Sequence, residues 1–175
     1  MKSSRNTPIY TKNGDDGRTA TLSGRRVSKN DPLIHLEGEL DGLNSHLGLI
    51  KAILPKGETG LFIEEIQKNL MKLMADVSRG DTEKRLFCGE ETAVLEREID
   101  RLSEKLPQDL KFVIPGKSVI EAQINIARTA ARRAERLFAA EIQQRLLPED
   151  KLPEDALIYL NRLSDYLFVL SRQDF

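Results

Sequence analysis

The sequence predicts an all-α fold, a five-helix up-and-down bundle with an N-terminal glycine-containing loop arm. Three observations predict it: apolar residues recur every three or four positions over five long segments, strand-like alternation is almost absent, and proline or glycine separates the segments. A chain of 175 residues has the length of one domain that needs no disulfide bonds. We therefore expect a single domain over 1–175, with an arm at 1–30 and the helical bundle at 31–175.

The arm is polar and rich in Gly, Ser, Thr, Asn and Arg. Asx-Gly pairs at 13–14 and 16–17 are turn signals. Successive glycines let backbone N–H groups converge on an anion, and Lys12, Thr19 and Lys29 would add two positive charges and a hydroxyl group. The alternative interpretation of this segment is a mobile polar tail.

The first helix is expected to begin at Asp31-Pro32, because Asp is a good N-cap and Pro suits the first helical position. Pro55 follows its last apolar residue and ends it. The predicted inward face carries Leu33, Leu36, Leu40, Leu43, Leu47, Ile50 and Leu54.

The middle of the chain predicts two more helices but carries no distinctive functional motif. One is expected over about 59–78 and the other over about 90–106, where Pro107 stops it. Their predicted inward residues are Phe62, Ile66, Leu70, Leu73 and Val77 in the second helix, and Leu95, Ile99, Leu102 and Leu106 in the third.

The fourth helix is expected to begin near Ser118, which forms a capping-box pattern with Glu121, and to end before Pro148. The fifth helix is expected to begin near Glu154. Beside its apolar seam, Asn161 and Asp165 lie one turn apart, for which hydrogen bonding on the helix surface is the simplest explanation. The seam residues are Ala156, Leu160, Leu163, Leu167 and Leu170.

The fourth helix carries four arginines and a glutamate within residues 128–136. At about 100° per residue, its alanines turn to one side and the charged residues to the other. Guanidinium groups suit bidentate contact with carboxylate or phosphate, so several on one helix could hold a polyphosphate. A solvated face with ion pairs along the helix is the alternative. The residues that share the charged side are Arg128, Arg132, Glu135 and Arg136.

Composition argues against several classes of function, among them the rival interpretation of a nucleic-acid-binding helical bundle that would use the arginine face on phosphates. The net charge of −1 gives no overall attraction to nucleic acid or an anionic membrane, and no aromatic stacking surface accompanies the arginines. The single cysteine, Cys88, excludes an intramolecular disulfide and a cysteine-based zinc site and fits a reducing compartment. No apolar run has the length of a membrane span. We therefore expect a cytoplasmic protein with no nucleic acid and no membrane as partner.

The sequence lacks two other functional motifs, a complete P-loop and a pair of histidines that could bind one metal ion. The run 115–118 before the fourth helix ends like a P-loop, but Lys111 stands where that motif requires glycine. His35 and His46 are about three helical turns apart, too far to share a metal ion.

Taken together, five motifs resemble the PduO-type ATP:cob(I)alamin adenosyltransferases, or corrinoid adenosyltransferases. The family pattern has the form T-K-x-G-D-x-G, G-x-R-x-x-K, L-D-x-L-N, A-R-T-x-x-R-R-A-E-R and Y-L-N-R-L-S-D. The chain carries these motifs in the same order at 11–17, 24–29, 40–44, 127–136 and 159–165.

The resemblance implies a five-helix bundle that assembles as a homotrimer, with ATP and the corrinoid in clefts between subunits. It implies transfer of the 5′-deoxyadenosyl group of ATP to the cobalt of cob(I)alamin, giving adenosylcobalamin and triphosphate. It also implies Mg²⁺ on the phosphates of ATP, a flavoprotein reductase that supplies reduced cobalamin, and an adenosylcobalamin-dependent enzyme that receives the product. A corrinoid escort that delivers adenosylcobalamin to a dependent mutase or dehydratase is the alternative.

Site residues are carried over from the same resemblance. Asp41 would pair with Arg128 of a neighbouring subunit, Arg132 would act on the triphosphate, and Phe112 and Phe168 would line the corrin side. Two departures from the family pattern are Asn13, at a position that is often Thr, and Lys117, where a second glycine is common. The residues implied to bind ATP are Thr11, Lys12, Asn13, Gly14, Asp15, Thr19, Ala20, Lys29, Arg132, Arg133, Glu135, Arg136 and Asn161.

Overall fold

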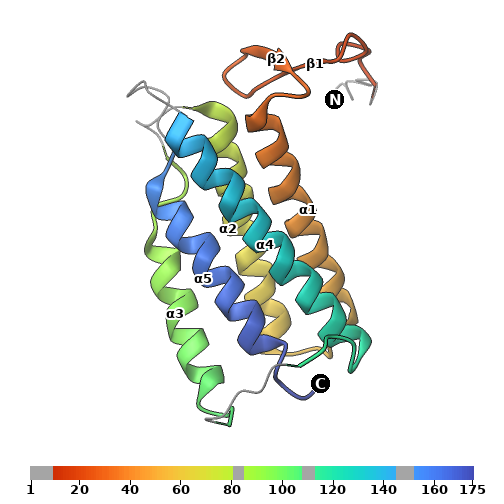
Figure 1. Ribbon diagram of the computed structural model, residues 1–175, viewed down its shortest axis with the longest axis vertical. Coiled ribbons are helices and arrows are strands. Elements are labelled where there is room, and N and C mark those ends of the chain that lie inside the picture. Colours follow the sequence, from red (N-terminus) through yellow and green to blue (C-terminus); the bar gives the residue numbers. More distant parts are fainter. Residues whose placement is uncertain (1–9, 81–84, 108–112, 145–151) are drawn as a thin grey trace, which may run out of the picture.

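The computed structural model describes residues 10–80, 85–107, 113–144 and 152–175. Five helices dominate these ranges and confirm the all-α prediction (Figure 1). Each described helix boundary lies within a few residues of the expected one. In chain order the elements are β1 (Arg18–Ala20), β2 (Arg26–Ser28), α1 (Pro32–Ile53), α2 (Glu58–Arg79), α3 (Glu90–Ser103), α4 (Val119–Gln144) and α5 (Glu154–Leu170).

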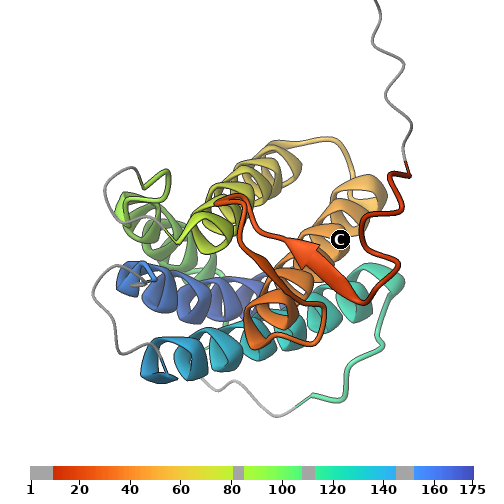
Figure 2. The same ribbon diagram turned by 90° about the horizontal axis from the view of Figure 1, so that it is seen from above.

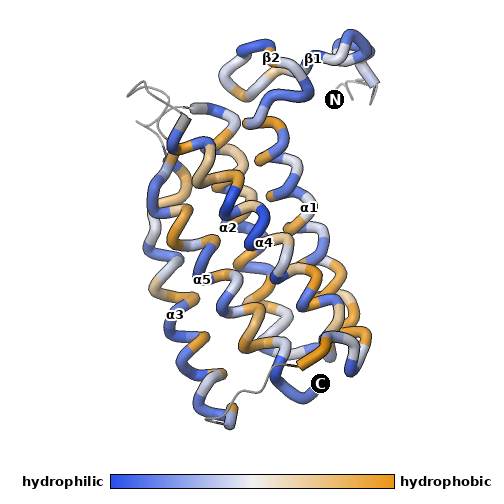
Figure 3. The backbone as a smooth tube through the Cα atoms, in the orientation of Figure 1, coloured by the Kyte–Doolittle hydropathy of each residue, from blue (hydrophilic) through white to orange (hydrophobic). Residues whose placement is uncertain are grey.

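The core consists of the inward faces that the apolar spacing predicts. Every predicted inward residue of α1 and α5 is buried. In α2 the face is slightly rotated, so that Ile63 is fully buried while Phe62 is half-buried and packs against Tyr166, with the rings tilted by 60° and 5.2 Å between their centroids. Hydrophobic and hydrophilic stretches therefore alternate turn by turn along the helices (Figure 3).

Small residues let α4 take a central place in the bundle. Ala127, Ala131 and Ala134 are fully buried, and α4 packs against both α1 and α5. The helix α1 also packs on α2, whereas the main partner of α3 is α5 (Figures 1 and 2). Alanine at these positions keeps the backbone of α4 close to its neighbours, which leaves the arginines on the outer side.

The arm departs from the expected irregular loop, because it contains a two-stranded antiparallel sheet. Thr19 lies opposite Val27, and Gly24, at φ +82°, takes the left-handed conformation in the connecting turn. Val27 is buried. Strands of three residues are too short to produce a visible alternation, so no strand pattern could be seen in the sequence.

The start of α4 confirms half of the predicted capping box. The Ser118 hydroxyl accepts the N–H of Glu121 at 3.1 Å. The carboxylate of Glu121, however, accepts the N–H groups of Gly116 and Lys117 at 2.6 and 3.1 Å, rather than that of Ser118. Glu121 thus ties down the loop before the helix as well as its first turn.

A buried aspartate organises the connection into α3. Both carboxylate oxygens of Asp76 accept the N–H of Leu86, at 3.0 and 2.9 Å, and one also accepts that of Phe87 at 2.8 Å. Phe87 is buried and meets Tyr159 of α5 edge-on, with 5.1 Å between centroids. Asp76 therefore fixes the segment that carries an aromatic anchor of the core.

Candidate active site on the arm and helix α4

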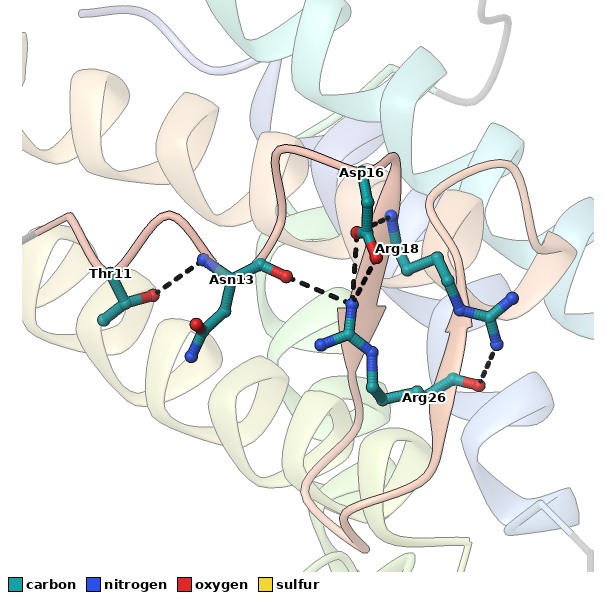
Figure 4. A network of polar contacts seen from close by, with 5 residues as sticks. All are labelled: Thr11, Asn13, Asp16, Arg18 and Arg26. Atoms are coloured by element: carbon teal, nitrogen blue, oxygen red, sulfur yellow. Dashed lines mark hydrogen bonds and ion pairs between the residues drawn. The ribbon is translucent and has the colours of Figure 1, made fainter.

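One arginine shapes the loop before β1 (Figure 4). Arg26 Nη2 donates to the carbonyl of Asn13 at 3.1 Å and to both carboxylate oxygens of Asp16 at 3.1 and 2.9 Å. Arg18 Nη2 in turn donates to the carbonyl of Arg26 at 2.9 Å, and the N–H of Asn13 donates to Thr11 Oγ1 at 3.5 Å. Sequence reasoning assigned no role to Arg26, although it is the arginine of the G-x-R-x-x-K motif.

The side chain of Lys29, which follows β2, reaches Gly14 in this loop, and Lys12 stands two residues before that glycine. A Cβ on Gly14 would lie 3.1 Å from Lys29 Nζ and 3.3 Å from the carbonyl of Arg18, so a larger residue here would crowd the Lys29 side chain. Lys12 has φ +60°, an uncommon conformation that clusters at functional sites. The N–H groups of Gly14 and Asp16 donate to no acceptor within the described part of the chain. Free amides and two cations at one loop suit an anion.

Some arginines of α4 bind side chains of the same chain, whereas others make no ion pair with the described residues. Arg133 Nη2 lies 3.1 Å from Glu39 Oε1 of α1, and Arg128 Nε donates to Asn125 Oδ1 at 3.2 Å. Arg132 and Arg136 are exposed and make no ion pair with any residue that the structure describes. The charged face is therefore partly a solvated, ion-paired surface and partly a set of free guanidinium groups.

The structure brings Glu135 and Asn161 together, as expected for residues of one site. Asn161 Nδ2 donates to Glu135 Oε1 at 2.9 Å, and its Oδ1 accepts from Arg162 Nη1 at 2.7 Å. Arg162 also pairs with Glu96 of α3 at 2.9 Å. The contact joins the arginine face of α4 to α5.

Within one chain, the loop and the arginine face lie apart. The arm crosses the ends of α1 and α2, where the N–H of Leu22 donates to Ser78 Oγ at 3.1 Å, whereas residues 128–136 occupy the middle of α4 (Figures 1 and 2). Among the described residues, no hydrogen bond or ion pair joins residues 10–17 to residues 128–136.

A pocket of about 460 Å³ opens between the arm, α1 and α2. Asp41 is exposed on its wall, next to Glu37, whose Oε1 is buried without a hydrogen-bond partner among the described residues. Burial raises the pKa of the Glu37 carboxyl, although a hydrogen bond with Ser78 opposes the shift. Sequence reasoning missed Glu37 because nothing in its spacing distinguishes it from other polar positions of α1.

The expected corrin side is described only in part. Phe112 lies outside the described residues, and Phe168 is half-buried with the Arg172 guanidinium 5.0 Å from its ring centroid. Arg172 also lines a pocket of about 430 Å³ together with Val113 and Phe175. Arg172 therefore covers the ring of Phe168 and also lines the neighbouring pocket at this end of the bundle.

The described residues show neither a metal-binding cluster nor a membrane-spanning helix. They contain no group of three or more His, Cys, Asp or Glu side chains that could hold a metal ion. None of their helices has both the length and the apolar character needed to cross a membrane.

The sequence matches the family model for cobalamin adenosyltransferase over residues 9–173. The chain belongs to this family. A corrinoid adenosyltransferase of Citrobacter freundii is 38% identical over 168 residues, which cover 94% of this chain and 93% of the relative. The corrinoid adenosyltransferase PduO of the same organism is 35% identical over 170 residues, and the chain spans about half of its length, because the match covers 95% of this chain but 49% of the relative.

Solved structures of cobalamin adenosyltransferases share the fold. A variant of the PduO-type ATP:corrinoid adenosyltransferase from Lactobacillus reuteri, complexed with cobalamin and ATP, is 32% identical with a TM-score of 0.86, and covers 94% of this chain and 92% of its own. Another variant of that enzyme, complexed with ATP, is 35% identical with a TM-score of 0.84, covering 94% and 92%.

Proposed function

We propose that this chain is an ATP:cob(I)alamin adenosyltransferase. The observation that carries the proposal is a pair of complementary anion-binding features, the loop around Gly14 with Lys12 and Lys29 and the free guanidinium groups of Arg132 and Arg136. They occur in a member of a family whose solved structures include complexes with cobalamin and ATP. Polyphosphate binding suits both features.

The reaction needs no nucleophile from the protein. Cobalt(I) of the corrinoid supplies the electron pair that forms the Co–C bond at C5′ of ATP, and the C5′–O bond breaks with its electrons leaving on triphosphate. The chain's task is to position ATP and to stabilise the charge on the departing group. Lys12, Lys29 and Arg132 would do so, with Mg²⁺ entering as part of the substrate MgATP.

Each site would combine two subunits of a homotrimer. The arm of one subunit would supply the loop residues, and a neighbour would supply the α4 face with Glu135 and Asn161. Asp41 of one subunit would pair with Arg128 of the next. This arrangement explains why one chain leaves the loop and the arginine face apart, and why Asp41 is exposed.

Phe112 and Phe168 would form the apolar wall against the corrin. Such a wall would exclude water and the lower axial ligand from cobalt and ease its reduction. A flavoprotein reductase would supply the electron, and an adenosylcobalamin-dependent enzyme would receive the product. The free Cys88 suits a reducing cytoplasm.

An anaerobic assay tests the activity. The protein is mixed with MgATP and chemically reduced cob(I)alamin, and the products are separated by chromatography. We expect a light-sensitive cobalt–carbon product and an equimolar amount of triphosphate. Release of diphosphate or orthophosphate, or unchanged cobalamin, would reject the proposal. Product that stays bound until a dependent mutase is added would add an escort role.

A further inference from the structure

Three polar side chains of α4 form a chain of hydrogen bonds from the preceding loop to Arg128. Glu121 Oε2 accepts the N–H groups of Gly116 and Lys117 at 2.6 and 3.1 Å. Glu121 Oε1 accepts from Asn125 Nδ2 at 2.6 Å, and Asn125 Oδ1 accepts from Arg128 Nε at 3.2 Å. Spacings of four and three residues place these side chains on one face of the helix.

Two acceptors of Glu121 set the direction of the bonds in this chain: its carboxylate, and its main-chain carbonyl, which accepts from the same Asn125 Nδ2 at 3.2 Å. An ionised Glu121 can only accept hydrogen bonds, so Asn125 must turn its amide NH₂ toward it. The carbonyl oxygen of Asn125 then faces Arg128. Glu121 is 7% exposed, and in such a buried position the reversed amide would leave polar groups opposed and unpaired.

The terminal groups of Arg128 are left available by this arrangement. Only its Nε is used, and no described residue accepts a hydrogen bond from Nη1 or Nη2. A planar guanidinium held at Nε presents its outer edge in one orientation, and a preorganised side chain loses less entropy when it binds.

We propose that Glu121 and Asn125 are positioning residues that fix the Arg128 guanidinium and couple it to the loop at 116–117. The Arg128 side chain would then already hold the rotamer in which it binds its partner. That partner would be the Asp41 carboxylate of a neighbouring subunit or the corrinoid beside it. This inference rests on the proposed function for its kinetic effect. The orientation of Arg128 itself is independent of that function.

One substitution, Glu121→Gln, is designed to reverse the direction of the hydrogen bonds. A second, Asn125→Asp, added to the first, is designed to restore it. In Glu121→Gln, the new carbonyl can still accept from the loop, but its NH₂ opposes the NH₂ of Asn125, which the main-chain carbonyl of residue 121 also binds. Asn125 escapes this opposition only by turning, which breaks that bond and presents a donor to Arg128. In Glu121→Gln/Asn125→Asp, the NH₂ at 121 donates to a carboxylate at 125, whose second oxygen again accepts from Arg128. The double variant therefore regains the native direction at nearly unchanged volume.

Kinetics provide the first measurement. We expect Glu121→Gln to lower kcat/KM for cob(I)alamin about tenfold, the factor for one hydrogen bond to a charged group, with KM for ATP nearly unchanged. The double variant should recover most of the loss. Asn125→Asp alone places two carboxylates in contact and should also be impaired. A double variant as poor as the single one, or an unimpaired Glu121→Gln, would overturn the proposal.

A spectroscopic measurement separates this inference from the proposed function. The Nε–H signal of Arg128, identified by its loss in Arg128→Lys, should shift in Glu121→Gln and return in the double variant. The shift and its reversal would support the positioning role even if no adenosyl transfer were found. An unmoved signal in a folded Glu121→Gln protein would overturn it even if the enzyme were active.

Discussion

At the scale of single residues, the arginines of α4 divide according to what already binds them. Arg133 pairs with Glu39 and Arg128 with Asn125, whereas Arg132 and Arg136 are exposed without an ion-pair partner among the described residues. A guanidinium without an internal partner can bind an incoming phosphate without first breaking a bond. Substitution of Arg132 or Arg136 should therefore affect catalysis with little effect on folding, and Arg132 is the one assigned to the triphosphate.

We expect Arg132→Ala to lower kcat by about 10²- to 10³-fold, since it removes one preorganised charge contact to the departing triphosphate. Because the side chain is exposed, the melting temperature should stay close to that of the wild type. Steady-state adenosylation kinetics and thermal unfolding measure the two quantities. Arg101→Ala is the matched control, an exposed arginine on α3 that pairs with Glu98 at 2.6 Å, and its kcat should be unchanged.

Glu37 predicts a pH-dependent difference in stability. Burial raises the pKa of its carboxyl above 4.5 in the folded protein, so the unfolded chain loses the proton first and folding is penalised as pH rises through this range. Glu37→Gln removes the penalty. We expect the melting temperature of the variant to rise relative to that of the wild type as pH is raised from about 4 toward neutrality. A relative loss over that interval would contradict the prediction.

At the scale of elements, the arm depends on Arg26 for its shape. We expect Arg26→Ala to raise KM for ATP about tenfold, since it removes hydrogen bonds from a charged donor to Asn13 and Asp16 that hold the loop. Stability should change little, because exposed ion pairs contribute at most about 1 kcal/mol. Arg25→Ala, on the neighbouring exposed position, is the control. Equal KM values for the two variants would show that Arg26 does not organise the loop.

Asp76 is expected to matter for stability rather than for chemistry. Asp76→Ala would leave the buried N–H group of Phe87 and the part-buried N–H group of Leu86 without their acceptor, at a cost of about 2 to 4 kcal/mol in the free energy of unfolding. Denaturant titration measures it, and Asp76→Asn, which keeps one acceptor oxygen, should lose less. An unchanged unfolding midpoint in Asp76→Ala would contradict this role.

The sequence predicts best those features that repeat along an element. Leu36, Leu40 and Leu43 recur at helical spacing, so the inward face of α1 follows from the sequence alone. The roles of Asp76 and Arg26 could not be predicted from the sequence. Each side chain binds backbone groups ten or more residues away, and only the folded chain defines the geometry of the turns between them. The grouping of Glu135 with Asn161 was expected from the family resemblance, and their contact is found. The roles of the site residues stay predictions.

At the scale of the whole molecule, the separation of loop and arginine face predicts complementation between inactive subunits. Lys12→Ala/Lys29→Ala damages the loop and Arg132→Ala damages the arginine face. If the chain assembles as the proposed homotrimer, one interface of each mixed trimer would join an intact loop to an intact face. Differently tagged variants, co-expressed and purified through both tags, should therefore recover about one third of the wild-type activity.

Each variant trimer alone serves as the control and should stay inactive. If every site lay within one subunit, mixed trimers would be as inactive as their parents. Sedimentation of the purified species establishes that trimers formed, so that absent activity cannot be confused with absent assembly.

The packing of α3 on α5 has a consequence for synthesis on the ribosome. The helices α1 and α2 are neighbours in sequence and in space, so they can pair soon after they emerge. Leu95 and Leu102 of α3 instead find their main partner in a helix that begins at Glu154. The apolar face of α3 therefore stays exposed to solvent while more than a quarter of the chain is still being translated. Chaperones would bind this face during that interval.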